Sequence, residues 1–154
     1  YHRLDVSATK KNKKALFDYE VLEKKEAGIV LNGSEVKSIR NGNCNLKGSF
    51  CKFMKGELWL FESHIGKYIY NDKFTEFDEK RVRKILIKQK EIEKWQKKLE
   101  LEQHLTIVPL EIYFNDNNRI KITISLCRGK KLYDKRESQK QKDISLNIKR
   151  ELSL

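Results

Sequence analysis

The chain has 154 residues, a length that suits one domain core of about 100 to 120 residues together with appendages. Charged residues make up 36% of the chain, and 34 Lys and Arg against 22 Asp and Glu give a formal charge of +12. This charge favours a polyanionic partner, and nucleic acid is the leading class of such partners. A basic soluble protein without such a partner is the alternative. No run of about 18 apolar residues exists, so no membrane-spanning helix and no membrane partner are expected.

The amino-terminal residues predict an arm followed by strands. Residues 1–14 contain five basic residues, one acidic residue and almost no apolar periodicity, which is typical of a basic arm. Residues 16–31 mix aromatic, β-branched and charged residues in near alternation, and they predict two short strands separated at Ala27-Gly28.

Residues 33–66 predict a short helix and a hairpin. Ser34 is the expected helix N-cap and Gly42 the expected stop. The run SFCKFMKGELWLFES predicts two strands joined by a turn at Lys55-Gly56. Residues 66–81 are polar and irregular, and we expect a loop there.

A strand and a second helix are expected next. The strand is placed around Ile85 to Lys88. In the following helix Ile92, Trp95 and Leu99 fall on one stripe, so one face is expected to pack and the other to be solvated.

Two alternating strands follow. The first places apolar residues at every second position, and Pro109 within it indicates an edge or a bulge. In the second, the core face is expected to carry Ile120, Ile122, Ile124 and Leu126. The opposite face, expected to meet water or RNA, carries Lys121, Thr123 and Ser125.

About six or seven short strands without a βαβ rhythm predict a mainly β fold, an OB-like antiparallel β-barrel with two or three short helices. A two-layer α+β sandwich is the alternative. The expected organisation is an arm at 1–14, a barrel at 15–128 and a basic tail at 129–154.

The carboxyl-terminal tail is expected to be disordered when free. From Arg128 onward there are nine basic and four acidic residues and few large apolar ones. Ile144, Ile148 and Leu152 recur at every fourth residue, so contact with a surface could order the tail as an amphipathic helix. A solvated tail without a specific role is the alternative.

Motifs for catalysis, metal or cofactor binding are missing from the sequence. Cys44, Cys51 and Cys127 form no CxxC pair and are expected to be free thiols, and no P-loop, nucleophile elbow or HExxH occurs. No catalytic residue, metal or cofactor is therefore expected. A basic RNA-processing enzyme and a permanently bound ribosomal protein are kept as alternatives. Tyr113 is among several aromatic residues that could stack on unpaired bases.

One long stretch, EAGIVLNGSEVKSIRNGNCNLKGSF, together with RKILIKQKEI, TIVPLEIYF and RGKKLYDKRE, resembles the small protein B family of trans-translation. The resemblance runs in order from about Asn12 to Glu137. It implies a monomeric, non-enzymatic OB-like barrel that binds the tRNA-like domain of tmRNA and delivers it to stalled ribosomes. Elongation factor Tu would accompany aminoacylated tmRNA, and the tail would enter the empty mRNA channel at the small-subunit decoding centre and become helical.

The resemblance also implies site residues. Those matching tmRNA-binding positions are Asn12, Lys13, Lys14, Glu26, Leu86 and Lys121. Glu26 would accept hydrogen bonds from base amino groups or 2′-hydroxyls, or hold a basic neighbour in place, whereas Leu86 is expected to support the core. Those matching the decoding-centre tail are Gly129, Lys130, Lys131, Tyr133, Asp134, Lys135 and Arg136.

The chain departs from the family pattern at Leu16-Phe17, where many members have Arg-His, so stacking or packing is expected to replace one basic contact. The expected location is the bacterial cytoplasm. The alternative is the stroma of a plastid-type organelle, with a targeting segment upstream of Tyr1 absent from this chain.

Overall fold

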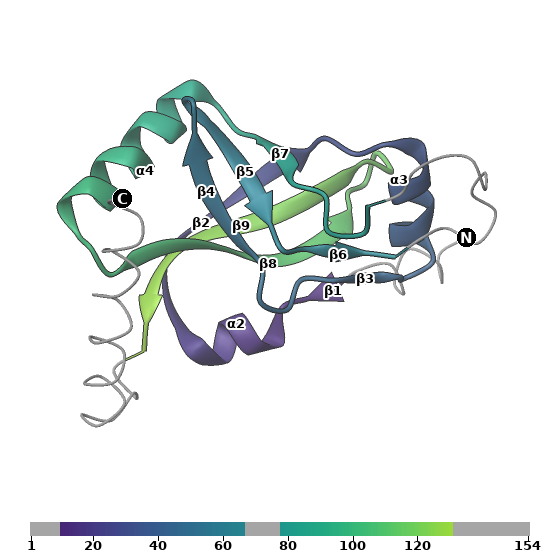
Figure 1. Cartoon of the computed structure of the whole chain (residues 1–154), viewed down its shortest axis with the longest axis horizontal. Coiled ribbons are helices and arrows are strands. Elements are labelled where there is room, and N and C mark those ends of the chain that lie inside the picture. Colours follow the sequence, from purple (N-terminus) through teal and green to yellow (C-terminus); the bar gives the residue numbers. More distant parts are fainter. Residues whose placement is uncertain (1–9, 67–77, 131–154) are drawn as a thin grey trace.

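The computed structural model describes residues 10–66 and 78–130 as an antiparallel β structure with three helices in that part of the chain (Figure 1). The helices are α2 (Lys13–Asp18), α3 (Gly33–Arg40) and α4 (Gln89–Leu101). The strands are β1 (Lys10–Lys11), β2 (Tyr19–Ile29), β3 (Cys44–Asn45), β4 (Phe50–Met54), β5 (Glu57–Phe61), β6 (His64–Ile65), β7 (Arg83–Leu86), β8 (Leu105–Phe114) and β9 (Ile120–Gly129).

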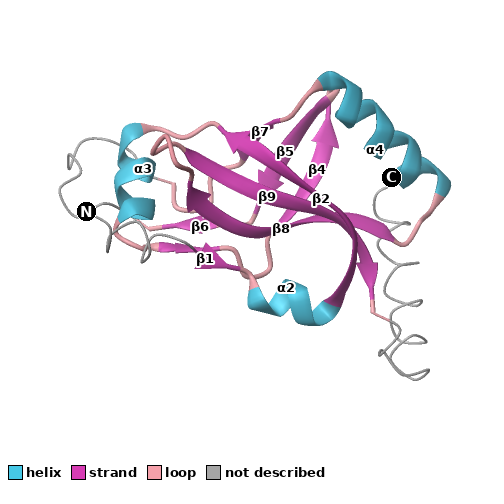
Figure 2. Ribbon diagram, turned by 180° about the vertical axis from the view of Figure 1, so that it is seen from behind, coloured by secondary structure: helices cyan, strands magenta, loops and turns pink. Residues whose placement is uncertain are grey.

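The strand pairings form a closed circuit. The order β8-β4-β5-β7-β2-β9 returns to β8 through a direct β8–β9 pairing, and every pair is antiparallel. Such a circuit is what a closed barrel has, because no strand of the ring keeps an unpaired edge along its whole length. The predicted mainly β, antiparallel class is confirmed. Figure 2 shows the long strands β2, β9 and β8 running side by side.

The interior is filled by alternate residues of the strands and by one face of α4. Trp95 of α4 is fully buried against Ile122 and Ile124 of β9 and other strand residues in one apolar cluster. Ile92 is also buried and Leu99 packs against the cluster, so the predicted stripe of α4 is confirmed. One face of α4 therefore packs on the apolar side chains that fill the interior of the strand ring.

A second, smaller cluster lies under α2. Ala15 of α2 packs with Val108, Leu110 and Cys127, on strands β8 and β9. The same end of β9 includes Ser125, which is 0% exposed and donates a hydrogen bond from its hydroxyl to the Val108 carbonyl at 2.7 Å. The expectation that Ser125 meets solvent or RNA is therefore wrong.

Tertiary contacts override the sequence pattern at the start of the body. Residues 13–18 form a helix where arm and strand were expected, so the expected boundary at residue 14 falls inside α2. Strand β2 runs unbroken through Ala27 and Gly28, because both pair with β9 and Gly28 also pairs with β7.

Two local predictions have different outcomes. The α3 cap is Asn32, not Ser34, because Asn32 and Glu35 form a reciprocal capping box. The hairpin turn at Lys55-Gly56 is confirmed, and both residues have positive φ, 52° and 77°. That combination is typical of a type I′ turn. Of the expected loop at 66–81, residues 67–77 lie outside the described residues.

Candidate RNA-binding surface

Four residues form one row across the outer face of the barrel. Gly28 on β2 pairs with Leu86 on β7 and with Lys121 on β9, and Lys121 in turn pairs with Tyr113 on β8. Glu26 lies two positions before Gly28 on the same side of β2 and pairs with Thr123. The register thus brings Glu26, Leu86 and Lys121 from three strands to one surface.

Leu86 covers Gly28. A Cβ at residue 28 would meet Leu86 Cβ at 3.3 Å and Leu86 Cδ1 at 3.5 Å, so the missing side chain leaves the space in which Leu86 rests. Leu86 is 49% exposed. The expectation that it supports the core is wrong, because it presents an apolar patch on the outer face.

Glu26 is exposed, and its carboxylate accepts a hydrogen bond from the Tyr113 hydroxyl. Burial and the Glu26 carboxylate raise the pKa of Tyr113 to about 12, although a side-chain hydrogen bond with Thr123 acts in the opposite direction. The Tyr113 hydroxyl is therefore protonated at neutral pH and acts as a donor to Glu26.

Glu26, Leu86 and Lys121 line a single open groove of about 670 Å³. The groove continues along β7 to the start of α4, where Lys88 and an ion pair of Lys84 with Glu57 join its lining. Lysines offer contacts to phosphate, a carboxylate accepts hydrogen bonds from base amino groups or ribose hydroxyls, and an apolar patch contacts a base or sugar. This combination is suited to folded RNA.

The amino-terminal site residues divide into one buried and two exposed residues. Asn12 is 4% exposed: its Nδ2 donates to the carbonyls of Pro109 at 2.9 Å and Leu46 at 3.2 Å. Its Oδ1 accepts from the Ala15 amide and caps α2. Lys13 and Lys14 are exposed on the first turn of that helix. Asn12 therefore holds the helix in place, and the lysines remain available to phosphates.

Pro109 explains why Asn12 is needed. An edge or a bulge was expected at Pro109, and the β8–β9 register shifts between Pro109 and Glu111, as at a bulge. The carbonyls of Pro109 and Leu110 lie at this irregularity. The Asn12 side chain and backbone amide bind these two oxygens.

Beyond Asn12, the other end of α2 approaches the end of β9. Phe17 is 73% exposed, and the Lys130 Nζ lies 5.7 Å from the centre of its ring. The departure at Leu16-Phe17 thus presents an aromatic face beside a cation, and Leu16 is 42% exposed. Of the expected tail residues, Gly129 ends β9 and Lys130 follows it, whereas Lys131, Tyr133, Asp134, Lys135 and Arg136 lie outside the described residues.

One cluster was missed by the sequence reading. Glu35 of α3 is 1% exposed and accepts from Arg83 and Arg81, with a 2.6 Å contact to each guanidinium. Burial acts to raise the pKa of Glu35, but hydrogen bonds from Arg81, Asn32 and Arg83 outweigh it and hold the pKa below its usual value. Arg83 also donates to Ser63.

Because Arg83 and Leu86 share β7, the cluster anchors the strand that carries part of the groove. The sequence signal for this cluster was that Arg83 lies two residues before Ile85 in a strand. Both side chains therefore face the same, buried side.

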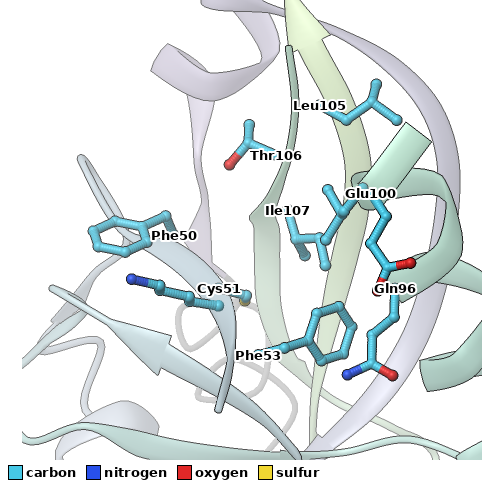
Figure 3. Close-up of a pocket in the computed structure, with 10 residues that line it drawn as sticks. Phe50, Cys51, Phe53, Gln96, Glu100, Leu105, Thr106 and Ile107 are labelled. Carbon is cyan, nitrogen blue, oxygen red and sulfur yellow. The ribbon is translucent and has the colours of Figure 1, made fainter. Parts of the chain in front are cut away.

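A second groove, of about 440 Å³, lies between α4 and the strands β4 and β8 (Figure 3). Its lining includes the apolar residues Phe50, Phe53, Leu99, Leu105 and Ile107. None of the expected site residues that the structure describes lines it. Charged lining residues are few, so its chemistry differs from that of the first groove.

All three cysteines are free and buried, and burial raises the pKa of Cys44 and of Cys127 to about 11. Within residues 10–66 and 78–130, no group of three or more His, Cys, Asp or Glu side chains is placed to hold a metal ion. In the same ranges no helix has the length and apolar character needed to cross a bilayer.

The fold and the first groove define a basic, single-barrel β protein with an outer face suited to RNA. The family model described as "SmpB protein" matches residues 9–154. The chain therefore belongs to the SmpB family.

Known proteins of this kind resemble the chain over most of its length. An SsrA-binding protein of Helicobacter hepaticus is 55% identical over 134 residues, 86% of this chain and 84% of the relative. One from Campylobacter jejuni (strain RM1221) is 46% identical over 139 residues, 90% and 92% of the two chains. A solved structure described as "tmRNA-SmpB: a journey to the center of the bacterial ribosome" superimposes with a TM-score of 0.68 at 41% identity, covering 89% of this chain and 94% of the other.

Proposed function

We propose that this chain is a tmRNA-binding adaptor that delivers the tRNA-like domain of tmRNA to stalled ribosomes. The observation that carries the proposal is the convergence of Glu26, Leu86 and Lys121 on one groove. Membership of the SmpB family, and relatives that are SsrA-binding proteins, support this choice of RNA.

The body and the tail have different tasks in this proposal. The groove and the lysines of α2 bind the tRNA-like domain. The tail from Gly129 onward, basic by composition, enters the empty mRNA channel and contacts rRNA at the decoding centre. The protein acts as a monomer in the bacterial cytoplasm, together with elongation factor Tu on aminoacylated tmRNA, and catalyses no reaction.

The test compares binding of the full chain to a tRNA-like-domain RNA, to ordinary tRNA and to duplex RNA of equal length. Binding is measured at physiological and at higher salt, because non-specific phosphate contacts weaken steeply with salt. A preference for the tRNA-like domain that survives higher salt supports the proposal. Equal binding to all three RNAs that is lost with salt contradicts it.

The division of tasks is tested by truncation after Gly129. The truncated chain should keep its affinity for the tRNA-like domain and lose peptide tagging on stalled ribosomes. Loss of affinity on truncation would contradict separate tasks for body and tail. RNA turnover by the purified protein would contradict the non-catalytic role.

A further inference from the structure

Tyr113 contacts Glu26 from two strands away. Tyr113 lies on β8 and Glu26 on β2, and strand β9 separates them. Because Tyr113 pairs with Lys121 while Glu26 pairs with Thr123, the contact crosses the outer face of β9 diagonally. The Tyr113 hydroxyl donates to Oε2 of Glu26. Among the described residues, the Glu26 side chain makes this one hydrogen bond, so Oε1 has no partner there.

We propose that Tyr113 is a positioning residue for RNA recognition: its hydroxyl fixes the Glu26 carboxylate so that the second oxygen accepts one hydrogen bond from the RNA. The inference rests on the proposed function, because it takes Glu26 to contact RNA. It assigns Tyr113 a role through its hydroxyl, and not through stacking of its ring on a base.

The physical reason is the mobility of an exposed glutamate. A free Glu side chain has several rotatable bonds and loses much of their conformational entropy when a partner orders it. Tyr113 is half-buried and has only two side-chain torsions, so it is a comparatively rigid donor. A carboxylate already held by such a donor loses less freedom on binding, and this raises its affinity for the partner.

The contact also limits what Glu26 can recognise. With Oε2 occupied by Tyr113, the carboxylate offers one oxygen to the ligand. A single donor group then fits best, such as one exocyclic amino group or one ribose 2′-hydroxyl. Lys121 stands beside Tyr113 in the same row and supplies the phosphate contact nearby.

The experiment is a double-mutant cycle on binding of the full chain to the tRNA-like-domain RNA. Tyr113→Phe keeps the ring and removes the hydroxyl, and it should weaken binding about five- to tenfold, because the freed Glu26 side chain must then lose more of its conformational entropy when the RNA orders it. The slope of affinity against salt should stay unchanged, because no cation is removed. In a Glu26→Ala background, Tyr113→Phe should cause no further loss.

Four outcomes overturn the inference. The first three are wild-type affinity for Tyr113→Phe, additive losses in the double variant, and a Tyr113→Leu loss far above that of Tyr113→Phe, which would assign the effect to the ring. If Glu26→Ala binds as well as the wild type, the positioning role also fails. The proposed function is judged separately, by the preference of the wild type for the tRNA-like domain, so the two failures are distinguishable.

Discussion

Arg83 and Glu35 form an ion pair at 2.6 Å in which neither side chain is more than 1% exposed. The pair joins β7 to α3, and Arg81 adds a second guanidinium from a half-exposed position. Removing one partner of such a pair leaves an uncompensated buried charge, which is more damaging than never having the pair.

Glu35→Gln should therefore lower the free energy of unfolding by about 3 kcal/mol or more at neutral pH. The folded-state pKa of Glu35 is below its ordinary value of 4.5. The stabilisation is thus fully present above pH 4.5 and is lost as the pH falls through the folded pKa. Urea unfolding at a series of pH values measures both effects, and the gap between wild type and variant should narrow on acidification.

The matched control is Glu62→Gln, which breaks the exposed contact with Lys80. A surface ion pair of this kind contributes little to the free energy of unfolding, so the control should unfold at the same urea concentration as the wild type. Equal urea midpoints for Glu35→Gln and the wild type at pH 7 would show that the buried pair adds no net stability.

Asn12→Ala should destabilise the body by about 2 to 4 kcal/mol, because it removes a helix cap and leaves two carbonyls without their donor. Thermal unfolding measures the loss. Asn12→Asp keeps the capping oxygen but places a buried carboxylate oxygen against the two carbonyl oxygens, so at neutral pH it should destabilise the body at least as much as Asn12→Ala. Lys11→Ala, one residue earlier and exposed, is the neutral control. Unchanged stability of Asn12→Ala would contradict the structural role.

Gly28→Ala should reduce RNA affinity with only a small stability loss, about 1 kcal/mol or less, because the new methyl group displaces Leu86 by a few tenths of an ångström. Gly28→Val should reduce affinity further by filling the space beneath Leu86. Gly33→Ala is the control, since a Cβ there meets nothing within 4 Å. Wild-type affinity for Gly28→Val would place Leu86 outside the RNA contact.

Lys121→Ala should weaken binding to the tRNA-like-domain RNA and lower the slope of log affinity against log salt by about one, because one phosphate contact is lost. The matched control is Lys52→Ala, an exposed lysine that lines the second groove. Binding titrations at several salt concentrations give the slopes. The same fall for both variants would mean that net charge matters and the first groove does not.

Local patterns were sufficient where a residue's environment depends on near neighbours. The alternation of Ile122, Ile124 and Leu126 predicted the core face of β9, and the spacing of Ile92 and Trp95 predicted the packed face of α4. Both follow from the period of a strand or a helix, which the sequence carries directly.

The features that local patterns did not predict depend on the pairing register between strands that are distant in the sequence. No local pattern tells that Asn12 binds the carbonyl of Pro109, 97 residues later. Nor does it tell that Leu86 faces outward over Gly28, or that Ser125 is buried. The family resemblance proposed Glu26, Leu86 and Lys121 as site residues, but only the register of β7, β2 and β9 explains why they lie together.

The position of β9 in the ring sets the order in which this protein can be completed. β9 pairs with β2 and with β8, so the ring stays open until residues 120–129 have been synthesised and released. Until then β2 and β8 each expose an unpaired edge, which is open to non-native pairing. Residues 130–154 continue directly from β9, the strand whose pairing closes the ring. The tail is therefore joined to the strand that completes the barrel.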